Sequence, residues 1–146
     1  MKIVLQRVKK ASVEIGGKVH CRIDQGVCLF VGVEKGDSLD EATRLAQKIV
    51  DLRIFPDAQG KMNLSLLEKR GKVLAVSQFT LAGSTAKGRR PSFDRAEEPQ
   101  LAEKIFDSFV QKIKDSGLEV EKGVFGALME VCLINDGPVT FILASV

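Results

Sequence analysis

Two short segments, far apart in the chain, hold residue types suited to chemistry on a small substrate. The first is Ser77-Gln78-Phe79-Thr80-Leu81, which places two hydroxyls and an amide at the end of an apolar run. The second is Asn135-Asp136-Gly137-Pro138-Val139-Thr140, with a proline beside a glycine where a β-hairpin should continue. Proline cannot donate to a strand ladder, so we interpret this backbone as reserved for recognition of a small substrate.

The hydroxyls of Ser77 and Thr80 lack an evident activating group. No histidine or carboxylate is adjacent to them, and an unassisted alcohol is a poor nucleophile near neutral pH. Backbone N–H groups around Phe79 and Thr80 are an alternative, because each oxyanion donor contributes roughly 2.7 to 4 kcal/mol in enzymes that use one. We expect Phe79 to pack beneath the pocket rather than to stack on a base.

The scarcity of histidine excludes most hydrolytic chemistries. A catalytic triad or a zinc-bound water would have to rest on His20, the single histidine, which we expect to be a solvated strand residue. We therefore expect no metal and no cofactor. Three cysteines without a CxxC pair stand in apolar contexts and are expected to be buried structural residues: Cys21, Cys28 and Cys132.

A local cluster of cations is more informative than the net charge of +3. Lys87, Arg89 and Arg90 lie in a loop punctuated by glycine and proline, directly after the first segment. Alone, such a run indicates a solvated surface. Its position beside the candidate site favours contact with phosphate. A second, smaller cluster lies near the N-terminus: Arg7, Lys9 and Lys10.

The elements that must position these residues fit one domain over 1–146, long enough to bury a core without disulfides. A capping box of Ser38 and Glu41 predicts a helix to about Arg53, and Pro99 and Gly117 bracket a second helix. A loop is expected over 55–63. Strands are expected over 2–8, 11–15, 18–23, 26–33, 72–80, near 120, and over 128–134 and 139–144.

We expect the last two strands to form a tight hairpin through Asp136-Gly137. The predicted fold class is α/β of the α+β type, with a mostly antiparallel, barrel-like sheet and two main helices. No apolar stretch is long enough for a signal peptide or a membrane span, which predicts a cytoplasmic protein.

Taken together, the motifs resemble the D-aminoacyl-tRNA deacylases, the D-tyrosyl-tRNA(Tyr) deacylase family, proofreading hydrolases that free tRNA from D-amino acids. The resemblance covers nearly the whole chain. Beside the two segments above, it rests on Gln6-Arg7-Val8, Leu52-Arg53-Ile54-Phe55, Gly60-Lys61-Met62-Asn63 and Gly88-Arg89-Arg90-Pro91-Ser92-Phe93.

The resemblance implies a homodimer with active sites at the subunit interface. Each Gly137-Pro138 pair is then a cis dipeptide inserted into the partner's pocket, supported by Arg7, while the catalytic segment is Ser77 to Thr80. Either Thr80 or the ribose 2′-hydroxyl of the RNA assists the reaction, and both possibilities stay open. The implied partner is aminoacyl-tRNA, bound at its 3′-terminal adenosine and acceptor stem.

Two positions depart from the family pattern. Leu128 follows Phe125-Gly126-Ala127, where the family commonly has an acidic residue, and Ala82 follows Leu81, where it often has an aromatic one. No role of that carboxylate is carried over to this chain.

Handedness is a hard selection problem, because D- and L-aminoacyl esters carry identical groups. Selection on a small apolar difference yields only about 1 to 3 kcal/mol. A 10⁴-fold preference needs about 5.5 kcal/mol. A rigid Gly137-Pro138 wall can supply it by steric exclusion, and it would admit glycine as well. Phe125, in a glycine-flanked loop, is our candidate for stacking the terminal adenine.

Two other functions are also compatible with the sequence. One is a non-catalytic RNA-binding module, in which Lys87, Arg89 and Arg90 do the main work. The other is an esterase for small esters, which predicts turnover of free D-amino acid esters without dependence on salt.

Overall fold

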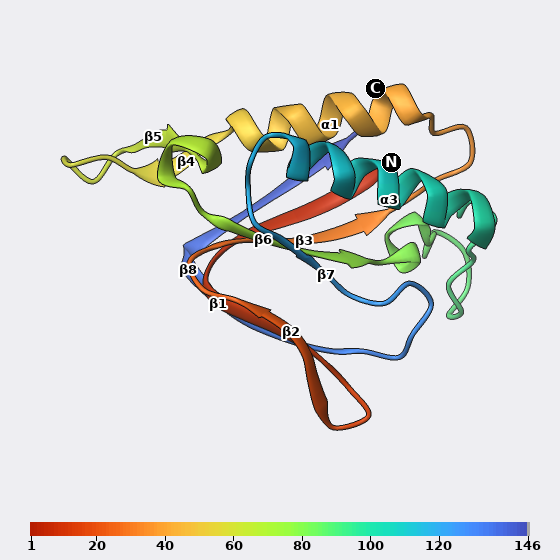
Figure 1. The fold of residues 1–146 in the computed structure, drawn as a ribbon. Coiled ribbons are helices and arrows are strands. Elements are labelled where there is room, and N and C mark those ends of the chain that lie inside the picture. The colour runs from red at the N-terminus through yellow and green to blue at the C-terminus, as the bar shows by residue number, and fades with distance from the viewer. Residues whose placement is uncertain (146) are drawn as a thin grey trace.

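The fold is a strongly curved sheet with two long helices packed on one face. The computed structural model describes residues 1–145, and Figure 1 shows the helices above the strands. The helices are α1 (Leu39–Asp51), α2 (Leu66–Lys69) and α3 (Pro99–Asp115), with a 3₁₀ turn η1 (Phe79–Ala82). The strands are β1 (Lys2–Ile15), β2 (Lys18–Ile23), β3 (Gly26–Gly32), β4 (Arg53–Pro56), β5 (Met62–Ser65), β6 (Lys72–Ser77), β7 (Val120–Lys122) and β8 (Glu130–Ala144).

The main sheet has the order β2-β1-β3-β6-β7, and β8 pairs with β1. Pairing of β1 with β2, β3 and β8 is antiparallel, whereas β3 with β6 and β6 with β7 are parallel. The sheet curls until its two ends meet, and the Cys21 thiol of β2 lies 3.5 Å from the Lys122 carbonyl oxygen of β7. The expected barrel-like α+β fold is confirmed, with a parallel part that the sequence did not indicate.

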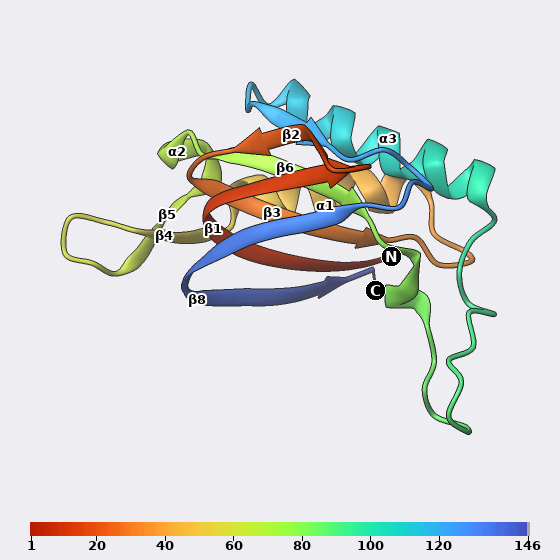
Figure 2. The same cartoon turned by 90° about the horizontal axis from the view of Figure 1, so that it is seen from below.

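The two C-terminal strands expected around a tight hairpin form one strand instead. Both halves of β8 pair with β1, from Lys2↔Ala144 to Glu14↔Glu130, so the chain does not reverse at Asp136-Gly137. Two shifts of register, between Gln6 and Val8 and between Val8 and Lys10, absorb the irregular stretch. The hairpin prediction is therefore wrong, because the turn-forming residues make a bulge in a continuous strand. Figure 2 shows β1 and β8 side by side along their length.

The two long helices begin and end for local reasons. The Ser38 hydroxyl accepts from the Glu41 backbone N–H, and the Glu41 carboxylate accepts from the Ser38 N–H, which confirms the capping box. Pro99 opens α3 at a first-turn position, where its missing N–H costs nothing. The apolar residues of α3 are buried except for Leu101, which is 45% exposed.

The interior has two apolar clusters, one on each face of the sheet. The larger lies between the sheet and the helices and includes Leu5, Ile49 and Phe109. The smaller fills the curl of the sheet and includes Cys21 and Cys28. These two cysteines are buried as expected, but Cys132 is exposed, because it lies on the outer side of β8. His20 is exposed, as expected.

The sequence missed one hairpin and a short helix. The predicted loop over 55–63 contains the end of β4 and the start of β5, which pair antiparallel, and α2 follows directly. No helix among residues 1–145 is long and apolar enough to cross a membrane.

Candidate active site

The first candidate segment lies at the carboxyl end of β6. The predicted strand ends at Ser77 rather than at Thr80, because Phe79 to Ala82 turn into η1. The Gln78 backbone N–H donates to the Val31 carbonyl oxygen at 2.8 Å, which ties the turn to β3. Gly32 permits this approach, since a Cβ there would lie 2.8 Å from the Gln78 carbonyl oxygen.

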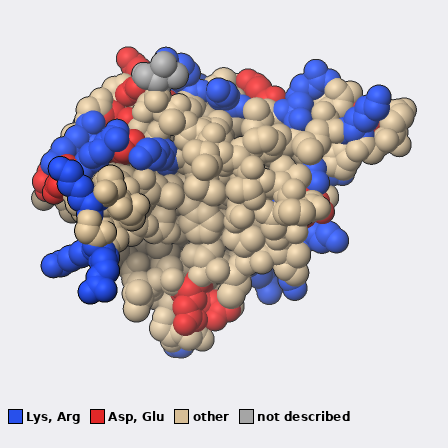
Figure 3. Space-filling view, turned by 180° about the vertical axis from the view of Figure 1, so that it is seen from behind, with Lys and Arg blue, Asp and Glu red and all other residues tan. Residues whose placement is uncertain are grey.

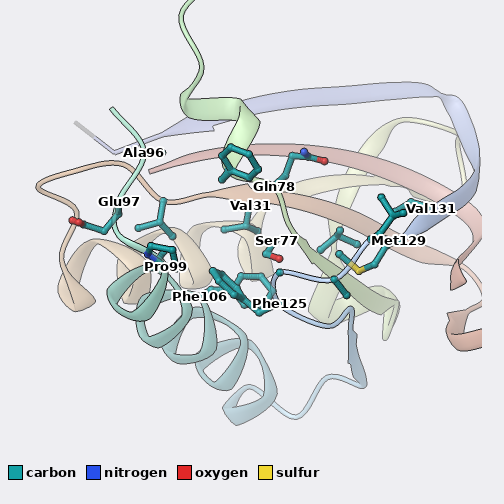
Figure 4. Close-up of a pocket in the computed structure, with 17 residues that line it drawn as sticks. Val31, Ser77, Gln78, Ala96, Glu97, Pro99, Phe106, Phe125, Met129 and Val131 are labelled. Carbon is teal, nitrogen blue, oxygen red and sulfur yellow. The ribbon is translucent and has the colours of Figure 1, made fainter. Parts of the chain in front are cut away.

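A cavity of about 550 Å³ opens beside this segment. Its walls come from β3, the β6 end, the start of α3 and the 125–129 loop (Figure 4). Glu97 is the one carboxylate among the described lining residues, and it lies at the far end of the pocket from Met129. The site is thus a largely apolar pocket with few polar groups, which is typical of small-molecule sites. Leu128, at the departure from the family pattern, is 93% exposed at this pocket.

Two hydroxyls of the segment have different surroundings. The Ser77 side chain is half-buried in the pocket and makes no hydrogen bond to any described residue. The Thr80 hydroxyl is exposed and accepts a 2.6 Å hydrogen bond from Gln78 Nε2. No histidine lines the cavity among the residues described. The arrangement therefore offers no general base for either hydroxyl.

The backbone offers donors at the same place. Phe79 and Thr80 begin η1, and the first N–H groups of a helix have no partner within it. Neither N–H has a hydrogen-bond acceptor within residues 1–145. Two adjacent free donors beside a pocket are suited to hold an anionic oxygen.

The two aromatic candidates lie on different sides of the pocket. Phe79 does not pack beneath the pocket as expected; it is 59% exposed and meets Phe93 edge to face, with ring centroids 5.0 Å apart. The ring lines the pocket from the exposed 3₁₀ turn instead, because β6 has already ended at Ser77. Phe125 is half-buried in the pocket wall, with its ring centroid 6.3 Å from that of Phe106.

The cation cluster lies in the loop that follows η1. Lys87, Arg89 and Arg90 are exposed in a loop closed by two backbone hydrogen bonds between Ser84 and Ser92, of 2.8 and 2.9 Å. The loop projects from the body (Figure 2). Contact between Phe93 and Phe79 fastens the base of this loop to η1.

The second candidate segment forms the bulge of β8. The Gly137-Pro138 peptide bond is cis, and both residues are exposed. Gly137 has a φ of +145°, and a Cβ there would lie 2.6 Å from Val139 Cγ2. Only glycine fits this position without displacement of its neighbours.

Two side chains hold the bulge. Arg7 is buried; its Nε donates to the Asp136 carbonyl oxygen at 2.9 Å and its Nη1 donates to the Ile54 carbonyl oxygen at 2.5 Å. Asn135 Oδ1 accepts from the Val139 N–H at 2.7 Å. The support from Arg7 was expected; the role of Asn135 was not, although a short amide just before a Gly-Pro pair is a turn signal.

The two segments do not meet within one chain. Ser77 pairs with Val31 of β3, whereas Arg7 of β1, which holds the bulge, pairs with Val27. Four residues of strand separate these points, about 13 Å along β3. The pocket and the Gly-Pro bulge therefore lie toward opposite ends of the sheet.

Fold and site define the class: a mixed α+β protein with an apolar pocket whose polar groups are hydroxyls, an amide and free N–H groups. No group of three or more metal-ligating side chains is found among residues 1–145. The sequence profile described as D-Tyr-tRNA(Tyr) deacylase matches residues 4–144.

Relatives at high identity agree with the profile. The D-aminoacyl-tRNA deacylase of Geotalea uraniireducens (strain Rf4) is 56% identical over 143 residues, covering 98% of this chain and 92% of the relative. That of Aquifex aeolicus (strain VF5) is 52% identical over 145 residues, 99% of this chain and 98% of the relative. The chain belongs to the D-Tyr-tRNA(Tyr) deacylase family, and a deacylase of this kind is a hydrolase of ester bonds.

Solved structures support the fold. One described as "c-Myc DNA Unwinding Element Binding Protein" has a TM-score of 0.93 at 39% identity and covers 99% of both chains. A second, described as "Structural Analysis of a probable eukaryotic D-amino acid tRNA deacylase", has a TM-score of 0.84 at 17% identity, covers 97% of both chains and supports the fold alone.

Proposed function

We propose that this protein hydrolyses the ester bond of D-aminoacyl-tRNA and releases free tRNA and the D-amino acid. The reaction takes place in the pocket beside Ser77 to Thr80. The observation that carries the proposal is the combination, in a member of this family, of an apolar pocket without a histidine and an exposed Gly-Pro bulge.

The chemistry follows from what the pocket offers. A water molecule attacks the ester carbonyl, and the oxyanion that forms accepts from the N–H groups of Phe79 and Thr80. The 3′-oxygen of the terminal adenosine leaves and takes up a proton. The neighbouring ribose 2′-hydroxyl orients the water, since no histidine lines the pocket and its one carboxylate, Glu97, lies at the far end from Met129. In this scheme Thr80 is not the nucleophile, because no basic side chain adjoins its hydroxyl to take up the proton.

Handedness is selected by main chain. Gly137-Pro138 of one protomer enters the pocket of its partner, where its carbonyl oxygens hold the α-amino group and its backbone excludes an L-side chain. A D-side chain points to solvent, and glycyl-tRNA is accepted too. The estimated separation of about 13 Å along β3 supports a trans arrangement, since a protomer's own bulge is too far from its own pocket.

A homodimer is therefore part of the proposal. An uncharged surface covers much of the molecule's rear face, with Lys and Arg gathered at its sides (Figure 3). On β8, Ile142 is 77% exposed and pairs in register with Val4, so both point to the same face of the sheet. An exposed apolar sheet face beside an edge strand is typical of an association surface.

The 3′ end of the tRNA lies in the pocket, and the acceptor stem extends away from it. Phe125 stacks on the terminal adenine, and Lys87, Arg89 and Arg90 contact phosphates of the acceptor stem. We place this activity in the cytoplasm, where its substrate is made, and it uses no cofactor.

One assay tests the proposal against its two rivals. Purified protein is incubated with matched D-, L- and glycyl-tRNA and with free D-amino acid esters, with and without a chelator of divalent metals. We expect loss of the D-ester and, more slowly, of the glycyl ester, with equal rates in the presence of chelator. Binding without cleavage would support an RNA-binding module, and equal turnover of free D-amino acid esters would support a small-ester esterase.

A further inference from the structure

A buried carboxylate lies behind the pocket wall, outside the residues discussed above. Glu34 follows β3 and is 7% exposed. Its Oε1 lies 3.2 Å from Lys2 Nζ and 3.4 Å from Arg95 Nη2. Its Oε2 lies 3.8 Å from the Met1 ammonium.

These contacts are between charges rather than hydrogen bonds. Within residues 1–145, Glu34 Oε1 has no donor in hydrogen-bond geometry. A buried oxygen in that state depends on the cations around it, so removal of its charge removes the attraction that holds Lys2 and Arg95 beside it.

Two of these cations, Lys2 and Arg95, adjoin segments that contribute residues to the pocket lining. Lys2 Nζ also donates to the Leu81 carbonyl oxygen at 3.4 Å, so it joins Glu34 to η1. Arg95 precedes Ala96 and Glu97, which line the pocket. The backbone around Arg95 is fixed to the same place, because the Lys35 N–H donates to the Arg95 carbonyl oxygen at 2.9 Å.

We infer that Glu34 is a positioning residue for deacylation: through Lys2 and Arg95, its charge holds η1 and the 95–97 wall at the spacing the ester requires. The inference rests on the proposed placement of the reaction in this pocket. Glu34 itself does not line the cavity and touches no substrate.

Glu34→Gln tests the role, because it keeps the shape of the side chain and removes its charge. We expect kcat on D-aminoacyl-tRNA to fall about tenfold with KM within about twofold, since the phosphate contacts of the 84–92 loop are not altered. Glu34→Asp, which keeps the charge, should recover part of the loss. The matched control is Glu119→Gln, which breaks an ion pair with Lys72 of 3.0 Å elsewhere and should leave both constants unchanged.

A double-mutant cycle separates positioning from general destabilisation. Lys2→Met removes the link to η1, so Glu34→Gln should cost less kcat in that background than in the wild-type chain. Equal costs in both backgrounds, or a Glu34→Gln protein that loses thermal stability but keeps its kcat while folded, would overturn the inference. A different result would show that the reaction does not take place in this pocket at all. In that case Ala127→Trp, which fills the pocket, would also leave activity intact.

Discussion

At the scale of single residues, two absences matter to the proposed site: a base beside Thr80 and a side chain on Gly137. Thr80 is the obvious nucleophile by type, but its oxygen accepts from Gln78 and no base adjoins it. Gly137 contributes by having no side chain, because its φ of +145° and its contact with Val139 exclude a Cβ.

Thr80→Ala tests the nucleophile directly. If backbone N–H groups and the RNA hydroxyl carry the chemistry, kcat on D-aminoacyl-tRNA should stay within about threefold of the wild-type value. Single-turnover assays measure it, with Thr80→Val as the isosteric control. A loss of several orders of magnitude in both variants would make Thr80 a participant.

Gly137→Ala tests the wall at the residue level. The added Cβ would meet Val139 Cγ2 at 2.6 Å, so the bulge must shift. We expect a fall in the ratio of D- to L-ester cleavage, with a loss of unfolding free energy of about 1 to 3 kcal/mol. Gly117→Ala is the matched control, since its φ is +88° and no atom lies within 4 Å of the new Cβ. An unchanged D/L ratio in Gly137→Ala would contradict the wall.

At the scale of elements, local patterns in the sequence predicted what local forces determine. The capping box at Ser38 and the proline at the start of α3 were sufficient to place both long helices. The predicted end of β6, at Thr80, was wrong because the residue types of a 3₁₀ turn also occur at strand ends. The C-terminal hairpin was wrong because pairing of both halves of β8 with β1 overrides a turn signal, and that pairing is not visible locally.

The same limit applied to the candidate site. The residues of both segments were found from their types, and the structure places Phe125 at the pocket of the first segment. Glu34 was missed because its partners Lys2 and Arg95 are distant in sequence and meet only after the sheet forms.

The loop over 84–92 should act on tRNA affinity and not on chemistry. Replacing Lys87, Arg89 and Arg90 by alanine should raise KM for D-aminoacyl-tRNA. It should also reduce the salt slope of binding by about 0.7 to 0.9 for each phosphate that the variant no longer neutralises. Turnover of a minimal D-aminoacyl-adenosine should not change. The control is alanine at Arg44 and Lys48, exposed cations of α1. A slope equal to that of the wild-type protein would refute the phosphate contact.

A buried thiol inside the curled sheet makes the free energy of unfolding depend on pH. Burial, and then the nearby Cys21, raise the pKa of the Cys28 thiol from 9.0 to about 12. Below pH 9 both folded and unfolded chains keep this proton; above it the unfolded thiol ionises first, so stability is lost as pH rises toward 12. Urea unfolding should show a contribution of up to about 1.4 kcal/mol per pH unit in that window.

That contribution should be absent in Cys28→Ala, whose overall stability is lower because of the cavity. Cys132→Ala, at the exposed thiol, should keep it. The same slope in all three proteins would assign the pH dependence to other groups.

At the scale of the whole molecule, the proposed site needs two chains. The pocket and the bulge face different ends of the sheet, and an exposed apolar face runs along β8. A symmetric dimer would use that face and place each bulge at the other protomer's pocket. Such an assembly would fix the wall by packing between protomers, which explains how an exposed bulge could discriminate handedness.

Mixed dimers test this claim most directly. Chains carrying Ala127→Trp have a blocked pocket and an intact bulge, and chains carrying Pro138→Ala have the reverse. After the two are mixed and allowed to exchange, the ratio of D- to L-aminoacyl-tRNA cleavage is measured. Selective D-ester cleavage that neither parent shows is the predicted result; a mixture that behaves as the sum of its two parents would contradict a wall supplied in trans.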